Sequence, residues 1–115
     1  LKFNKFYLTL KNLSKSDQVI EFFVEKNVFE NSKYFEKHKK IILNQSFFNN
    51  PDEIILRSIT QVVLHVGKKK NYPRGKKVVG LVDSLKFSKK NVKLTLSGCI
   101  IEKINNSVII YQEKH

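Results

Sequence analysis

The 115-residue chain carries 22 basic and 10 acidic residues, for a net charge of +12, and 41% of its residues are apolar. This length fits one small domain with a modest core, and the apolar content is too high for a disordered basic tail. No apolar run approaches the length of a membrane span, and the first residues do not form a signal peptide. The chain contains no Met, which leaves open that it belongs to a longer protein.

Cysteine and histidine are too sparse for a metal site. The single cysteine, Cys99, excludes an internal disulfide and a zinc site built from several cysteines. His38, His65 and His115 share no ligand-like spacing, so we expect no metal, and a reducing cytoplasmic location. Cys99 is expected to be a buried small residue rather than a reactive thiol. His65 is expected to be a partly exposed helix residue or a partner of the helix dipole, rather than a catalytic base.

The first part of the chain is expected to be mainly helical. Alternating apolar residues indicate a short strand at 3–10, although a frayed helical end fits as well. Ser14 begins a capping-box pattern, and the apolar residues after it recur at helical spacing, which predicts a helix over 15–30. The polar stretch 31–40 is expected to turn, and the apolar run 41–48 does not by itself select a helix or a strand.

A second helix is predicted over residues 51–66. Asn50 is expected to accept its first free N–H groups, and Pro51 suits the first helical position. The two carboxylates that follow complement the positive end of the helix dipole. A periodic apolar face comes next, and Gly67 is the expected left-handed stop.

A third helix and three strands complete the predicted elements. A basic connector at 68–74 leads into a helix that Pro73 is placed to open and that runs to about residue 86. Tight turns at Gly98 and at Asn105–Asn106 then separate three strands. These strands are expected at 92–97, 99–104 and 107–112.

The predicted fold class is α+β. We expect a helical N-terminal region, then a helix–loop–helix packed on a small antiparallel sheet. Residues 1–50 are expected to be a helical connecting region, and residues 51–115 a C-terminal domain with two helices and three strands.

Positive charge is concentrated in one quarter of the chain. Residues 65–93 carry ten basic residues against Asp83 alone, a net of +9, whereas residues 1–64 carry +3 and the rest is neutral. Such a block attracts polyanions, phosphate backbones above all. A lysine-rich solvated surface is the alternative that charge alone leaves open. A membrane surface fits less well, because these cations do not form the polar face of one apolar helix.

The candidate RNA-binding residues come from this block. Lysines need only proximity to contact phosphates. Tyr72, beside cations, can stack on an exposed base, but it can equally pack over the helix junction. The predicted RNA-binding residues are Lys68, Lys69, Lys70, Tyr72, Arg74, Lys76, Lys77, Lys89 and Lys90.

The sequence contains no catalytic constellation that we can identify. Its four glycines form no phosphate-binding loop, and no spacing of serine, histidine and carboxylate supports a triad. We therefore expect no catalytic residue and no cofactor in this chain.

Five short motifs follow one another over the last 60 residues. They are Arg57, Val66-Gly67, Tyr72-Pro73-Arg74, Thr95-Leu96-Ser97-Gly98-Cys99 and Tyr111-Gln112-Glu113. This order resembles the C-terminal end of bacterial tRNA(Ile)-lysidine synthases. The chain departs from the family pattern where Lys68 and Ser97 replace glycines, where Pro73 stands alone, and where Gln112 replaces arginine.

The resemblance implies a specific parent activity. The family enzymes use ATP to adenylate the wobble cytidine of a minor isoleucine tRNA and then attach lysine. Their adenylation depends on an N-terminal domain with an SGGxDS loop, which these 115 residues lack. The resemblance thus implies a C-terminal portion whose partner is tRNA, with ATP bound by the missing domain. The alternative is a free-standing basic RNA-binding or protein-interaction module without catalysis. The oligomeric state is left open by the sequence.

Overall fold

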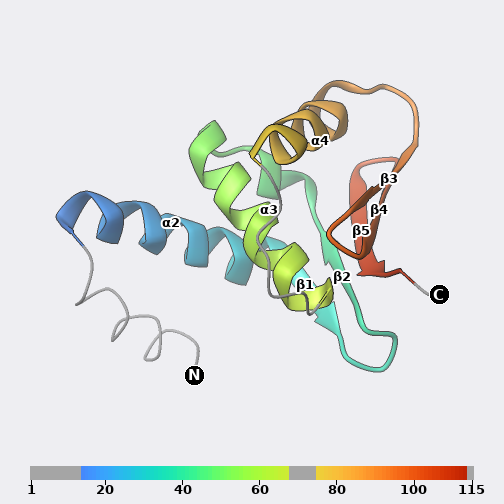
Figure 1. Ribbon diagram of the computed structural model, residues 1–115, viewed down its shortest axis with the longest axis horizontal. Coiled ribbons are helices and arrows are strands. Elements are labelled where there is room, and N and C mark those ends of the chain that lie inside the picture. Colours follow the sequence, from blue (N-terminus) through green and yellow to red (C-terminus); the bar gives the residue numbers. More distant parts are fainter. Residues whose placement is uncertain (1–13, 68–74, 114–115) are drawn as a thin grey trace.

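The fold is α+β, as the sequence predicts. The computed structural model describes residues 14–67 and 75–113 (Figure 1). The strand expected at 3–10 and the basic connector at 68–74 lie outside the described residues. The elements are α2 (Lys15–Asn31), β1 (Ser32–Phe35), β2 (Lys40–Leu43), the 3₁₀ helix η1 (Gln45–Phe48), α3 (Asp52–Gly67), α4 (Gly75–Phe87), β3 (Val92–Leu96), β4 (Cys99–Ile104) and β5 (Ser107–Gln112).

The five described strands form one antiparallel sheet in the order β1-β2-β5-β4-β3. The hairpin strands β3, β4 and β5 lie where the sequence predicts them. Strand β2 pairs with β5, which places Ile41 opposite Ile110. The described parts of the segments before and after residue 50 therefore share one sheet. The division into two domains at this point stays a prediction.

The core lies between one face of the sheet and the helices α3 and α4, while α2 lies beside α3 (Figure 1). Ile55, Ile59 and Val63 of α3 are fully buried, and so are Ile101 and Ile110 of the sheet. Burial of each such side chain stabilises the fold by about 1.5–3 kcal/mol. Packing on α3 thus sets the positions of the sheet and of α4.

The N-terminal half differs from the sequence expectation in one segment. The turn expected at 31–40 is wrong for its first half, because Ser32–Phe35 form strand β1 and only residues 36–39 turn. Strand β1 lies at the edge of the sheet and pairs with β2 alone, so polar side chains are tolerated there. The ambiguous run 41–48 divides into the end of β2 and η1.

The predicted N-cap of α2 is confirmed, whereas the predicted roles of Asn50 and Gly67 at the two ends of α3 are wrong. The Ser14 hydroxyl accepts the Asp17 N–H at 3.2 Å, as a capping box requires. Asn50 does not cap α3, because the Pro51 carbonyl accepts the first N–H groups and the Asn50 amide donates to Asn27 Oδ1 at 3.0 Å. Nor is Gly67 a left-handed stop, since it remains the last residue of the helix.

Gly67 serves close packing instead. A Cβ at this position would lie 2.6 Å from the Ser97 carbonyl oxygen and 3.1 Å from Cys99 Sγ. The end of α3 can therefore approach the β3–β4 turn only without a side chain at residue 67. The left-handed residues in the described hairpin turns are Lys39, at φ 49°, Ser97 and Gly98, at φ 48° and 79°, and Asn105, at φ 57°. The hairpin turn predicted at Asn105–Asn106 is thus confirmed.

Candidate nucleic-acid interface

Four of the nine predicted RNA-binding residues lie in the described part of the chain. Lys76 and Lys77 occupy the first turn of α4, and Lys89 and Lys90 follow its last turn; all four are exposed. The remaining five predicted residues lie outside the described residues. They are Lys68, Lys69, Lys70, Tyr72 and Arg74.

The N-terminal end of α4 combines two sources of positive potential. Its first turn contains no acidic residue, whereas Lys76 and Lys77 both stand there. The unpaired N–H groups of a helix start carry about half a positive charge, so lysines destabilise the helix slightly at this end. An anion bound there would relieve this repulsion. The helix start is thus suited to a phosphate group.

The C-terminal end of α4 is held by cations that serve the fold. Lys103 Nζ donates to the carbonyls of Leu85 and Ser88 at 2.7 and 2.8 Å. Lys86 Nζ lies 3.2 Å from Asp52 Oδ1, which ties α4 to the start of α3. These two lysines are therefore engaged within the protein.

Lys89 and Lys90 stand beyond this anchor on a short turn. The Ser88 hydroxyl accepts the Lys90 N–H at 3.3 Å and donates to the Lys90 carbonyl at 3.0 Å, which fixes the backbone between them. Their side chains remain exposed. A rigid backbone with outward ammonium groups is an arrangement that can contact phosphates.

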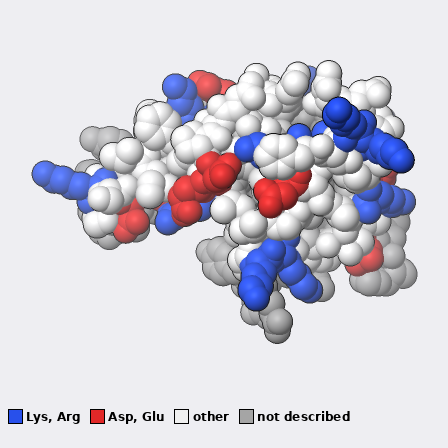
Figure 2. Space-filling model, turned by 90° about the horizontal axis from the view of Figure 1, so that it is seen from above, with Lys and Arg blue, Asp and Glu red and all other residues white. Residues whose placement is uncertain are grey.

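The four described lysines among the predicted RNA-binding residues form two groups rather than one patch. Because α4 has 13 residues, its ends lie about 20 Å apart. Figure 2 likewise shows basic side chains in several separate groups on this face, with acidic side chains between some of them. These four lysines thus place positive charge at both ends of α4.

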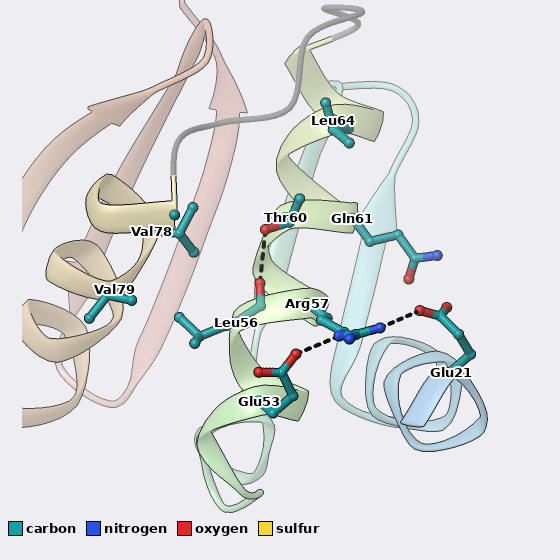
Figure 3. A pocket seen from close by; sticks show the side chains of 10 residues that line it. Glu21, Glu53, Leu56, Arg57, Thr60, Gln61, Leu64, Val78 and Val79 are labelled. Carbon is teal, nitrogen blue, oxygen red and sulfur yellow. Dashed lines mark hydrogen bonds and ion pairs between the residues drawn. The ribbon is translucent and has the colours of Figure 1, made fainter. Parts of the chain in front are cut away.

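A cavity of 540 Å³ lies alongside α3, with α4 on one side and Glu21 of α2 on the other (Figure 3). Its apolar wall includes Leu56, Leu64 and Val78. Arg57 faces it and is already paired (Figure 3). Arg57 Nε donates to Glu53 Oε2 at 2.6 Å, and Nη1 lies 3.4 Å from Glu21 Oε1.

Arg57 therefore links α2 to α3 rather than offering a vacant phosphate site. Its hydrogen bond to Glu53 is the main cause of its raised pKa, with a further contribution from Glu21. Two carboxylates surround one guanidinium, so the charge of the cavity disfavours an anion. The spacing of Glu53 and Arg57, four residues apart on a helix, was the sequence signal for this ion pair.

Comparisons with known proteins give one partial similarity. A tRNA(Ile)-lysidine synthase from Wolbachia pipientis wMel is 30% identical to this chain over 67 residues. The match covers 58% of this chain but 16% of the relative, so the chain spans less than a fifth of that protein's length. No family model and no solved structure matches the chain. This relative bears the name of the enzyme family that the five sequence motifs resemble.

Cys99 and His65, the two residues weighed above as a reactive thiol and a catalytic base, lie where their structural roles predict. Cys99 is fully buried, and its thiol donates to the Val63 carbonyl at 3.3 Å. His65 is exposed in the last turn of α3, where its ring packs edge-on against Tyr34 with centroids 5.4 Å apart.

The described part of the chain shows neither a cluster of metal ligands nor a membrane-spanning helix. Within 14–67 and 75–113, no three His, Cys, Asp or Glu side chains gather as metal ligands would. In the same residues, no helix is both long and apolar enough to cross a membrane.

Proposed function

We propose that this chain is a tRNA-binding part of a cytoplasmic, tRNA(Ile)-lysidine synthase-like ligase and corresponds to the C-terminal end of such an enzyme. The observation that carries the proposal is the 30% identity over 67 residues to a protein of that name. In this proposal, ATP and the ligation of lysine belong to an N-terminal domain with the SGGxDS loop. The chain itself contributes tRNA binding without catalysis.

The cationic ends of α4 support this role. Lys76 and Lys77 add their charges to the positive end of the helix dipole, and Lys89 and Lys90 project beyond its other end. We assign these four side chains to phosphates of the tRNA, together with the predicted cations Lys68, Lys69, Lys70 and Arg74, and keep Tyr72 as the predicted stacking residue. Such contacts hold an RNA in place and carry no sequence information of their own.

Titration of the full chain with tRNA at several salt concentrations tests the proposal. Each phosphate contact steepens the salt dependence of binding, by up to about 0.9 units of log–log slope. The double variant Lys76→Glu/Lys77→Glu is expected to weaken binding and to lower the slope by about two units. A matched control, Lys15→Glu/Lys26→Glu, makes the same charge change at exposed positions of α2 and is expected to lower the slope much less.

Equal losses in both double variants would show that net charge, rather than α4, governs binding. The same experiment with charge reversal at Lys69, Lys70 and Arg74 tests the predicted connector. Unchanged tRNA affinity in that variant would refute its assignment.

One observation favours a second candidate function, a protein-interaction module. Helix α2 exposes several large apolar side chains, among them Val19 at 56%, Phe22 at 43% and Phe29 at 48%. Such a face is typical of a contact with another protein. A chain with this function alone would bind tRNA weakly and without saturation.

A further inference from the structure

The sheet has a second face, opposite the one on which α3 and α4 pack (Figure 1). Side chains alternate between the two faces along each strand. On the helix side, Ile41 and Ile110 are buried in the core. The strand register brings the intervening residues together on the opposite face, which we call the outer face. One row across it consists of Phe35, Lys40, Tyr111, Ile100 and Thr95.

The outer face is apolar at its centre. Ile42 and Ile109 lie opposite each other in the next row, beside Tyr111 and Ile100. All four of these side chains are partly exposed. None of them belongs to the buried core or is among the partly buried side chains that pack against it. Of the described helices, α3 and α4 cover only the other face.

Cations surround this apolar centre. Lys33 Nζ lies 5.3 Å from the centre of the Phe35 ring, and Lys40 Nζ lies 5.9 Å from it. Lys93 stands on the other edge strand, opposite Glu102. Three lysines and one carboxylate thus share the outer face, which gives it a positive charge that a polyanion complements.

Tyr111 holds a fixed position at the centre of the outer face. Its hydroxyl donates a hydrogen bond to Glu102 Oε1 on the neighbouring strand. This bond restrains the ring, so a base that stacks on it meets a prearranged surface. Phe35 lies two strands away in the same row, at about 10 Å. Sheets with aromatic side chains on an open face are known to stack RNA bases in this way.

We propose that the outer face binds unpaired RNA nucleotides, with bases stacked on Tyr111 and Phe35 and phosphates near Lys33, Lys40 and Lys93. The inference rests on the proposed function, because it assumes that the chain binds RNA and assigns the unpaired nucleotides of that RNA to the outer face. The α4 lysines need only a phosphate backbone, whereas the outer face requires bases that are free to unstack. Lysines interleaved with aromatic rings favour a nucleic acid over a protein segment, which would gain little from three like charges.

Binding of a 12-nucleotide single-stranded RNA to the full chain, compared with a duplex of the same sequence, tests the proposal. Tyr111→Leu is expected to weaken single-strand binding about 5- to 100-fold, because one base loses its stacking partner. Duplex affinity is expected to change little. Tyr111→Phe keeps the ring but loses the restraining bond to Glu102, so it is expected to bind single strands more weakly than the unaltered chain and more tightly than Tyr111→Leu. Phe29→Leu removes an exposed aromatic ring from α2 and is expected to have no effect.

A second variant tests the outer face independently, in case Tyr111→Leu does not fold. Lys33→Glu/Lys93→Glu reverses two exposed charges at the edges of the sheet and leaves the apolar centre intact. It is expected to lower single-strand affinity and to reduce the salt slope by about 1.4 units, because each phosphate contact to a single strand contributes about 0.7. Circular dichroism on each variant shows that the fold is retained.

The outcomes separate this proposal from the function on which it rests. If tRNA binds but Tyr111→Leu and the double lysine variant leave single-strand binding unchanged, the outer face is not an RNA site. The same holds if Tyr111→Leu instead abolishes a concentration-dependent self-association, which would make the face a contact between copies. If the unaltered chain binds neither tRNA nor single strands, the proposed function itself is wrong.

Discussion

The side-chain amide of Asn27 on α2 donates a hydrogen bond of 3.1 Å to the hydroxyl of Ser58 on α3. Both residues are buried, with 3% and 0% of their surfaces exposed. Asn27 also donates to the Phe47 carbonyl at 3.2 Å, and its carbonyl oxygen accepts from Asn31 and Asn50. One asparagine therefore connects α2, η1, α3 and the segment before α3. Because α2 has apolar residues on several sides, this polar cluster selects which side faces the protein.

Asn27→Ala is expected to destabilise the protein by roughly 1–3 kcal/mol, because it removes the buried oxygen that accepts from Asn31 and Asn50 and the amide that donates to Ser58 and Phe47. Chemical denaturation followed by circular dichroism measures this change. The neighbouring exposed residue gives a control, since Lys26→Ala is expected to change stability by less than about 0.5 kcal/mol. Similar stabilities for the two variants would show that the cluster contributes nothing net.

Two glycine-to-alanine substitutions are expected to act in opposite directions. At Gly67 the new methyl group would lie 2.6 Å from the backbone oxygen of Ser97, which cannot yield without moving the β3–β4 turn. Gly67→Ala is expected to cost about 1–3 kcal/mol. Gly80 lies inside α4 with nothing within 4 Å of an added Cβ, so Gly80→Ala is expected to stabilise by about 0.5–1 kcal/mol. Thermal unfolding of both variants measures the contrast, and a loss at both positions would contradict the packing argument.

The sequence predicts elements whose signals are local. Helix α2 was found from its N-cap at Ser14, and the hairpin β4–β5 from alternation around Asn105–Asn106. Strand β1 was missed because it has only four residues, two of them polar, and becomes a strand only by pairing with β2 at the sheet edge. Gly67 was misread as a stop because its close neighbour, Ser97, lies 30 residues further along the chain.

The candidate site shows the same limit. Charge counting identified Lys76, Lys77, Lys89 and Lys90 but could not show that α4 separates them into two groups. Nor could it show that Lys86, in the same block, is paired with Asp52 of another helix. The outer face was missed entirely, because Phe35 and Tyr111 are far apart in sequence and are brought into one row only by the pairing of β1, β2 and β5.

Lys103 offers a test of how the end of α4 is fixed to the sheet. Its ammonium group donates to the Leu85 and Ser88 carbonyls, which are among the last carbonyls at this helix end. Lys103→Met keeps the length of the side chain and removes both charged hydrogen bonds, so it is expected to cost about 1–3 kcal/mol. Amide hydrogen exchange is expected to rise first at residues 85–90. Lys93→Met, on the outer face, is the control and is expected to leave this exchange unchanged.

The hydroxyl of Tyr111 gives the protein a pH dependence at alkaline pH. Its hydrogen bond to Glu102 is the largest cause of its raised pKa, followed by burial and by repulsion between the carboxylate and a phenolate. In the unfolded chain the phenol ionises near its ordinary value of 10.0, before it does so in the folded protein. The contribution of this group to stability is therefore fully present below about pH 10 and is lost as the pH rises through the folded pKa.

Comparison with Tyr111→Phe isolates this contribution, because every other side chain is common to both proteins. The stability of the unaltered chain is expected to fall more steeply above about pH 10 than that of the variant. Glu102→Gln removes the carboxylate and is expected to lower the pKa of Tyr111 toward its ordinary value, which ultraviolet absorbance of the phenolate reports. An unchanged phenolate titration in Glu102→Gln would mean that Glu102 does not restrain the Tyr111 ring in solution.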